Sequence, residues 1–218
     1  MTFVRPSRAE TRPRRRLGAL PGWVVAGLLA GFSSGVLAAV AANDAVITVA
    51  ELHAGLLAAA ERRDDPFAER YAALAPLIMA THDLDYIGQI TIRREWRNLT
   101  AQQQAEFGEA FRRLAIANYV ARFGGLQNAS FAIVGNEALP QGRQQVSAIL
   151  QPEGGESVTL NYVLHEIDTG EWKVINVVAN GVSDLALKRA EFQRVLQDGD
   201  FAGLLEHLHT QSERLAKP

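Results

Sequence analysis

The spacing of apolar residues along the chain changes twice. Between about residues 48 and 123, apolar positions recur every three or four residues, as they do on one face of a helix. Between residues 131 and 179 they alternate with polar positions, as they do in strands with one buried face. Beyond residue 183 the helical spacing returns. Helices followed by strands and then by helices predict an α+β fold.

The first two helices are predicted from the residues at their ends. Thr48 and Glu51 form a capping box, which predicts a helix from there to about Arg63. The sequence Asp64-Asp65-Pro66 ends this helix and begins a second one, because proline is favoured at the first helical position. Pro76 falls inside the second helical pattern, where it predicts a kink or a break.

Two more helices are predicted before the strands. A third runs from Leu84 to Trp96, and a second capping box, Thr100 with Gln103, opens the longest helix of the chain. Gly124-Gly125 ends this long helix. Its apolar residues cover a wide arc, so it must be buried on more than one side or face an apolar ligand.

The alternating region predicts an antiparallel meander of four strands. The clearest strand is Ser157–His165, in which apolar and polar residues alternate except at Val163. Turns at Glu153-Gly154-Gly155 and Asp168-Thr169-Gly170 connect it to its neighbours. The other strands are centred on Phe131–Ile133, on Val146–Leu150 and on the stretch from Trp172 to Ala179. Short connections of this kind join antiparallel neighbours.

The last strand leads directly into a helix. Strict alternation along Trp172–Ala179 would place Val174 and Val178 on the same face. Asn180-Gly181 then breaks the strand, because both residues tolerate a positive φ. Ser183 is placed to cap the helix that follows. Nothing in this stretch is chemically reactive, so we interpret it as architecture around an apolar interior.

Composition narrows the classes of function. The chain has no cysteine, which excludes disulfides, thiolate nucleophiles and Cys-ligated metal sites. Six of the 22 basic residues precede Gly22, and the 16 basic and 23 acidic residues after residue 42 give that part a net charge of −7. A net-acidic body argues against sequence-independent binding to phosphate backbones, so we predict no nucleic acid partner.

The first 42 residues have the layout of a secretory signal. An arginine-rich start is followed by an uncharged stretch from Leu17 to Asn43 that ends in small residues. We predict export and cleavage near residue 42; the alternative is an uncleaved anchor, because the uncharged stretch is long enough to span a bilayer. Gly31-Phe32-Ser33-Ser34-Gly35 in this leader matches a hydrolase nucleophile motif but lacks the strand–turn–helix context that the motif requires.

No catalytic or metal-binding constellation stands out in the remaining sequence. His207 and His209 point to opposite sides of a helix and lack a third ligand, so we predict no metal site. His82 beside Asp83 and Asp85 could act as an oriented base, but no activated nucleophile accompanies it. A helix-end histidine beside acids is the favoured interpretation. We predict no catalytic residues and no cofactor.

Three segments give residues 46–216 a resemblance to a known family. They are HDLDYIGQITIRREWRNLTAQQQAEFGEAFRRLAIANYVARFGG, the hairpin ending in VTLNYVLHE, and EWKVINVVANGVSDLALKRAEFQRVL, which is similar to a W-K-V-x-D-V-x-x-x-G-V-S element. The chain resembles the MlaC-like, or toluene-tolerance, periplasmic lipid-binding proteins. ANYVARF and DLALKRAEF look especially like the HpnM branch, which accompanies hopanoid biosynthesis. Asn176 stands where the family usually has Asp, and Arg93 where a Gly often precedes the Trp.

The resemblance implies a periplasmic carrier in an ABC-type pathway that moves lipid between membranes, with no catalysis. Its partners would be a phospholipid or hopanoid ligand, an inner-membrane ABC transporter complex and an outer-membrane lipid-transfer complex. The implied fold is a helical layer on a curved four-strand antiparallel sheet, similar to cystatin and NTF2-like folds, with an apolar cavity between the layers. The residues that we predict to line this cavity are Leu74, Ile78, Phe111, Leu114, Tyr119, Val158, Leu160, Tyr162, Val174, Val178 and Phe192.

Two other functions stay open at this point. An enzyme or accessory factor of hopanoid biosynthesis would need a polar pair such as His82 and Asp85 inside the cavity. An interaction module would have a packed core and no ligand, because any α+β domain needs a core and each predicted lining residue could serve only that purpose. The volume between the long helix and the sheet distinguishes these alternatives, because a lipid carrier needs an empty apolar space there and a packed interaction module does not. Each methylene of a lipid buried in such a space would contribute about 0.8 kcal/mol to binding.

Overall fold

The computed structural model describes residues 43–123 and 125–217, so the predicted signal segment lies outside the described residues. Within them, the helices are α1 (Asp44–Ala60), α2 (Phe67–Thr81), α3 (Leu84–Thr91), α4 (Arg93–Trp96), α5 (Ala101–Phe123), α6 (Asp184–Asp198) and α7 (Phe201–Ala216). The strands are β1 (Ser130–Leu139), β2 (Arg143–Gln151), β3 (Val158–Glu166), β4 (Trp172–Ala179) and β5 (Val182–Ser183). The predicted α+β class is confirmed.

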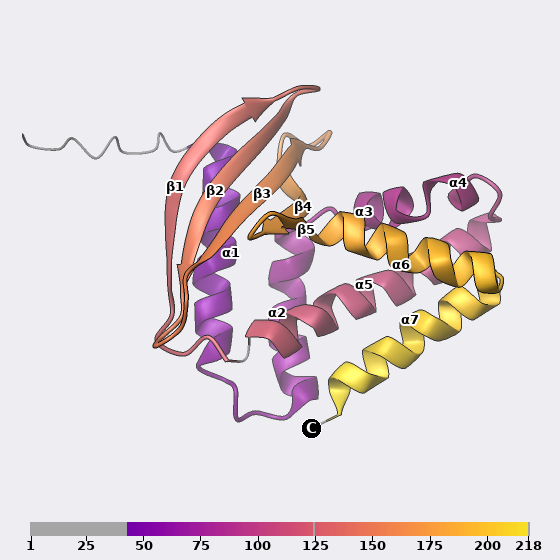
Figure 1. Ribbon diagram of the computed structural model, residues 1–218, viewed down its shortest axis with the longest axis horizontal. Helices are drawn as coiled ribbons and strands as arrows, with labels where there is room; N and C mark the ends of the chain where they lie inside the picture. Colours follow the sequence, from indigo (N-terminus) through magenta and orange to yellow (C-terminus); the bar gives the residue numbers. More distant parts are fainter. Residues whose placement is uncertain (1–42, 124, 218) are drawn as a thin grey trace, which may run out of the picture. The chain divides into compact units, whose positions relative to one another are not determined.

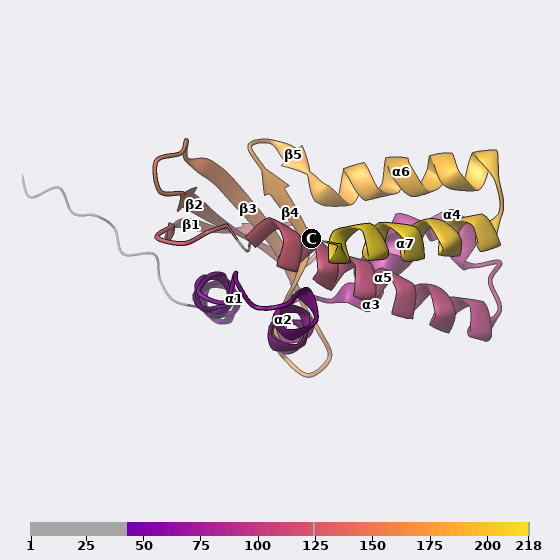
Figure 2. The same cartoon turned by 90° about the horizontal axis from the view of Figure 1, so that it is seen from below.

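The strands form one antiparallel sheet in the order β1-β2-β3-β4-β5, and the helices lie along it and beyond the side formed by β4 and β5 (Figure 1). Helix α1 contacts β1, β2 and β4, and α2 contacts α1 and β4. Figure 2 shows α1 and α2 together below the sheet, whereas α6 and α7 run side by side away from it. Helix α5 packs against α2, α3 and α7, so it lies at the centre of the helical layer.

The sheet has five strands, so the prediction of four is wrong by one short strand. Asn180 and Gly181 have φ values of 47° and 82° and join β4 to β5 as a two-residue turn. Two positive φ values in succession produce the tight turn that suits a hairpin. The chain therefore folds back along β4 at Val182–Ser183 before α6 begins, instead of passing directly from strand to helix.

Two bulges bend the sheet around α1. The register of β1 with β2 skips Val134, and the register of β4 with β3 skips Ile175. An extra residue in one strand increases the local twist and bend. The bulge at Ile175 also reverses the alternation after it, because Val174 pairs with Leu164 whereas Val178 pairs with Asn161 on the other face. The prediction that Val174 and Val178 share a face is therefore wrong.

Several helix ends differ from the prediction. Helix α1 begins at Asp44, because the side chain of Asn43 accepts a hydrogen bond from the backbone N–H of Val46. Thr48 does not cap a helix; its hydroxyl lies 3.0 Å from the carbonyl oxygens of Asp44 and Trp172. Pro76 does not break α2, which is continuous around it.

The prediction was wrong for the helix before Thr100 and was confirmed for the start of the helix after it. The expected third helix is interrupted at Ile92 and forms α3 and α4. The capping box before α5 is confirmed: the Thr100 hydroxyl accepts from the N–H of Gln103 at 3.2 Å, and the Gln103 side chain accepts from the N–H of Thr100 at 2.9 Å. Ser183 likewise caps α6, where it accepts from the N–H of Ala186.

The core lies between α5 and the elements around it. Phe107 and Phe111 of α5 meet Phe192 of α6, with both ring centroids 6.3 Å from that of Phe192 and both pairs edge to face. All three rings are fully buried. The cluster fixes α6 against α5 at one end, and the other end of this helix pair borders the site described below.

Candidate functional site

An apolar pocket of about 310 Å³ lies where α5, α6 and β4 meet. We call it the α5–α6 pocket. Helix α5 contributes Phe111 and Ala115, β3 contributes Leu160, and β4 contributes Val174 and Val177. Because Val174 and Val177 lie on opposite sides of the Ile175 bulge, the bulge is what brings both side chains to this face. The pocket lies between the long helix and the sheet, where an apolar cavity was expected.

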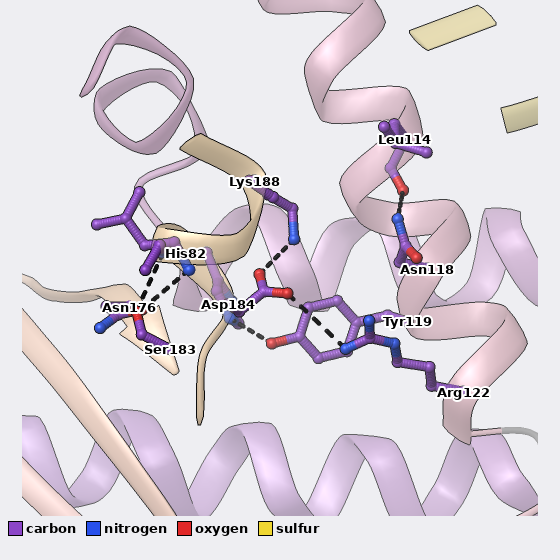
Figure 3. Close-up of polar contacts among 11 residues, drawn as sticks. His82, Leu114, Asn118, Tyr119, Arg122, Asn176, Ser183, Asp184 and Lys188 are labelled. Carbon is purple, nitrogen blue, oxygen red and sulfur yellow. Dashed lines mark hydrogen bonds and ion pairs between the residues drawn. The ribbon is translucent and has the colours of Figure 1, made fainter. Parts of the chain in front are cut away.

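The mouth of the pocket carries both apolar and charged side chains. Val182 of β5 and Leu187 of α6 line it although they are 52% and 56% exposed. Asp184 lies between two cations: it pairs with Lys188 one turn later and with Arg122 of α5 at 3.8 Å (Figure 3). An apolar opening with charged groups around it suits a ligand that has a hydrocarbon part and a polar end.

The N-terminus of α6 is fixed to the sheet by Asn176. Its side-chain oxygen accepts hydrogen bonds from the hydroxyl of Ser183 at 3.0 Å and from the N–H of Leu185 at 3.2 Å. Figure 3 shows Asn176 and Ser183 together with the ion pairs of Asp184. Only an acceptor oxygen is needed here, so the amide of Asn176 can do what an aspartate would do at this position.

A buried chain of hydrogen bonds crosses the wall of the pocket. The Tyr119 hydroxyl lies 2.7 Å from Nε2 of His82, and Nδ1 of His82 lies 3.0 Å from the hydroxyl of Thr81, which also bonds the carbonyl of Leu77 at 2.8 Å. If Thr81 donates to that carbonyl, it accepts from Nδ1–H, and Nε2 then accepts from Tyr119. Each group in this arrangement has a partner while His82 is neutral.

The pKa values in this chain are shifted away from neutrality. Burial lowers the pKa of His82 from 6.5 to about 4 and outweighs the hydrogen bond with the Ile78 backbone and the charge of Asp184, which raise this pKa, while Lys188 lowers it further. Burial raises the pKa of Tyr119 well above 10. A general acid or base is most effective with a pKa near the working pH. The pair therefore fits a structural polar contact better than proton transfer.

The carboxylates that could have oriented His82 point elsewhere. Asp83 binds Nε2 of His165 at 2.8 Å and accepts from the N–H of Tyr86 as the cap of α3. Asp85 is largely exposed and pairs with Arg112. The His82–Asp85 pair that the enzyme alternative requires is not formed.

A second buried histidine lies under the sheet. His53 of α1 stacks on Phe131 with ring centroids 4.0 Å apart, and its Nε2 lies 3.0 Å from the hydroxyl of Tyr162. Burial lowers its pKa to about 4 as well. Both His53 and His82 are therefore kept neutral by the fold at pH 7.

These histidines predict a loss of stability in mild acid. Their folded pKa values lie below the unfolded value, so their contribution to stability is complete above pH 6.5 and is lost as the pH falls toward 4. We expect up to about 3 kcal/mol per histidine over this range. Urea unfolding at several pH values measures it. His53→Gln should flatten the profile, whereas His209→Gln, at an exposed position, should leave it unchanged; equal profiles for all three proteins would contradict the prediction.

Four of the eleven predicted lining residues line the α5–α6 pocket: Phe111, Tyr119, Leu160 and Val174. Five others are buried in the core outside it: Leu74, Ile78, Leu114, Tyr162 and Phe192. Val158 is partly buried against the core, and the bulge places Val178 on the face opposite Val174. Their role in holding a ligand stays a prediction.

Four polar residues of the pocket were not predicted as site residues: Asn118, Arg122, Asp184 and Lys188. On α5, Ala115, Asn118 and Arg122 line it together with Phe111 and Tyr119. Their spacing of four, three, one and three residues is that of one helical face, so a search for a stripe of mixed polarity would have found them. Asp184 and Lys188, four residues apart on α6, follow the same rule.

The described residues offer no other obvious chemistry. Residues 43–123 and 125–217 contain no group of three or more side chains placed to hold a metal ion. None of the helices formed by these residues combines the length and the apolar character needed to cross a bilayer.

A helical layer over a curved antiparallel sheet, with an apolar pocket between them, defines a protein that can hold an apolar ligand. The chain belongs to the MlaC family: the family model described as MlaC protein matches residues 48–210. Its fold is also that of a phospholipid-binding protein from Ralstonia solanacearum, solved in complex with a phospholipid. That structure matches with a TM-score of 0.70 and 23% identity, over 82% of this chain and 100% of the other. No curated protein matches the sequence.

Proposed function

We propose that this protein is an exported carrier that holds a hydrocarbon chain of a phospholipid in the α5–α6 pocket. The observation that carries the proposal is the apolar pocket between α5 and the sheet, with a partly charged mouth. Membership of the MlaC family, whose members are lipid-binding carriers and not enzymes, supports it. The phospholipid in the Ralstonia solanacearum structure supports the same class of ligand.

The size of the pocket fits one alkyl chain. A methylene group occupies about as much room as a water molecule, roughly 30 Å³, so a pocket of about 310 Å³ holds about ten of them. At about 0.8 kcal/mol each, ten buried methylenes contribute about 8 kcal/mol before the cost of ordering the chain. This gain opposes the release of the hydrocarbon chain into water.

The resemblance implies the setting of this carrier. We propose that it works in the periplasm, between an inner-membrane ABC transporter complex and an outer-membrane lipid-transfer complex. A lipid with its hydrocarbon buried and its polar end at the mouth can be passed on without exposing the chain to water. The mouth near Val182 and Leu187 is the exit that this proposal requires.

A hopanoid is the second candidate ligand, and one observation favours it. The segments that look like the hopanoid-associated HpnM branch, residues 117–123 and 184–192, both contribute walls of the α5–α6 pocket. They provide Tyr119, Phe123, Leu185 and Leu187 among the lining residues. If the resemblance reflects ligand choice, these are the side chains through which it would act.

Mass spectrometry of the lipids extracted from protein purified from its native host tests the proposal. We expect about one phospholipid per chain, or a hopanoid if the second candidate is correct. Protein prepared under the same conditions that repeatedly carries neither lipid would refute both. The extract of an unrelated exported protein of similar size gives the background.

A further inference from the structure

A second concave surface adjoins the pocket at β4 and has a very different character. It has a volume of about 870 Å³ and lies among α3, α4, the β1–β2 turn and α6. We call it the arginine groove, because its wall includes Arg93 at the start of α4, Arg97 directly after α4, Arg143 of β2 and Arg189 of α6. The aromatic side chains of Tyr86 and Trp96 also line this groove.

The positive charge of this groove is not compensated. No aspartate or glutamate lines it, and none of its four arginines forms an ion pair with any described residue. The part of the chain after residue 42 has more acids than bases, and other arginines, such as Arg62 and Arg112, do pair with acids. Four arginines gathered without a counter-charge repel one another, so a bound anion would stabilise them.

Two of the guanidinium groups are held in place by contacts with α3. Nη2 of Arg143 donates to the hydroxyl of Tyr86 at 3.3 Å, and Nε of Arg189 donates to the carbonyl of Ile90 at 3.0 Å. Each retains further N–H groups. A planar guanidinium that is already positioned loses little freedom when it binds the oxygens of a phosphate with two parallel hydrogen bonds. Arg93 and Arg97, four residues apart and exposed, can approach the same anion.

The groove and the α5–α6 pocket share three wall residues: Ile175, Asn176 and Leu185. A site for hydrocarbon and a site for an anion thus lie back to back, with the bulge of β4 and the start of α6 between them. The concave form of the arginine groove favours binding of a compact anion over binding of a flat surface. The groove is lined by Trp and Arg and by no lysine or acid, a composition that would also suit an acidic peptide. An acidic peptide, however, would make no use of the apolar pocket that adjoins the groove.

We propose that the arginine groove is a binding site for a phosphate group. The phosphate is that of a lipid headgroup or a free anion, since the same hydrogen bonds recognise both. This inference goes beyond the proposed carrier function and does not depend on it, because the groove is lined by residues that an empty or differently filled pocket would leave in place.

Binding by the full chain to two probes tests the site. Inorganic phosphate is titrated by isothermal calorimetry, and sedimentation measures binding to vesicles of phosphatidylcholine with and without phosphatidylglycerol. The double variant R93Q/R97Q removes two exposed arginines of the groove. Its matched control is R94Q combined with R194Q, which removes two exposed arginines outside the groove. The arginines before Gly22 are present in every protein, so it is the difference in affinity between the two double variants that reports on the groove.

We expect R93Q/R97Q to weaken binding at least about tenfold and the control pair to weaken it less than about twofold. Binding should also weaken at higher salt. Preference for vesicles with phosphatidylglycerol identifies the headgroup as the source, whereas binding of inorganic phosphate alone identifies a free anion. A glutamate-rich peptide is titrated in the same way as a third probe. The site is overturned if neither phosphate nor the vesicles bind, if both double variants lose affinity equally, or if only the peptide binds in an arginine-dependent way.

R143Q provides a second measurement at the anchored side of the groove. It should weaken binding of the same probe by about tenfold. Thermal unfolding of each variant shows whether the fold is intact. R143K, which keeps the charge but loses the planar fork, should restore part of the affinity. Equal affinity of wild type, R143K and R143Q, all folded, would overturn the assignment of Arg143 to the site.

Discussion

Phe192→Ala is expected to lower the free energy of unfolding by about 4 kcal/mol. Phe192 is 0% exposed and is the only residue of α6 that is fully buried. Its removal would leave a cavity between Phe107 and Phe111, which contact it edge to face. Both the transfer energy of the ring and the cost of the cavity contribute to the loss.

Urea unfolding at pH 7 measures this effect, with Gln193→Ala as the control. Gln193 is the next residue on α6 and is exposed, so its replacement should change stability by less than about 0.5 kcal/mol. A loss below about 1 kcal/mol for Phe192→Ala would show that the ring is not part of the packed core. That result would instead favour the sequence-based prediction that Phe192 lines a ligand cavity.

Local interactions made part of the fold predictable. The Thr100–Gln103 capping box and the Ser183 cap each involve residues within one helical turn, and both were found from the sequence. The break of the strand at Asn180-Gly181 was found for the same reason, since tolerance of a positive φ is a property of the residues themselves, whereas the pairing of β5 with β4 beyond it was not. In each case the signal and the structure it specifies lie within a few residues.

Long-range contacts set the features that were missed. Thr48 has the pattern of a cap, but its hydroxyl faces Trp172, which is 124 positions away along the chain. The bulge at Ile175 depends on the pairing of β4 with β3 and leaves no mark in the alternation of β4. It moved Val178 off the face that carries Val174, which shows how a single extra residue can change the membership of a site.

The candidate site was only partly predictable for a related reason. A search for apolar residues finds core and pocket alike, and Ile78 and Phe111 are equally buried although only Phe111 lines the pocket. What separates them is an empty volume, which no property of one residue encodes. The charged residues at the mouth, Arg122 and Asp184, come from different helices and meet only when α5 and α6 are packed.

Ala115→Trp is expected to weaken lipid binding by about 200-fold. Ala115 lies on α5 in the wall of the α5–α6 pocket and is 8% exposed. An indole ring at this position would occupy the space of about four methylenes, and about 0.8 kcal/mol for each gives a loss of about 3 kcal/mol. The ring would enter a space that is already apolar, so the fold should be retained.

Ala121→Trp places the same ring on the same helix at an exposed position outside the pocket, which makes it the matched control. Affinity for a fluorescent phospholipid and the amount of lipid carried after purification measure the effect in both variants. The control should bind like the wild type, and unfolding curves should confirm that Ala115→Trp is folded. If the folded Ala115→Trp protein still binds lipid with wild-type affinity, the hydrocarbon chain is not held in this pocket, because the indole ring would take the room of about four of the ten methylenes that the pocket can hold.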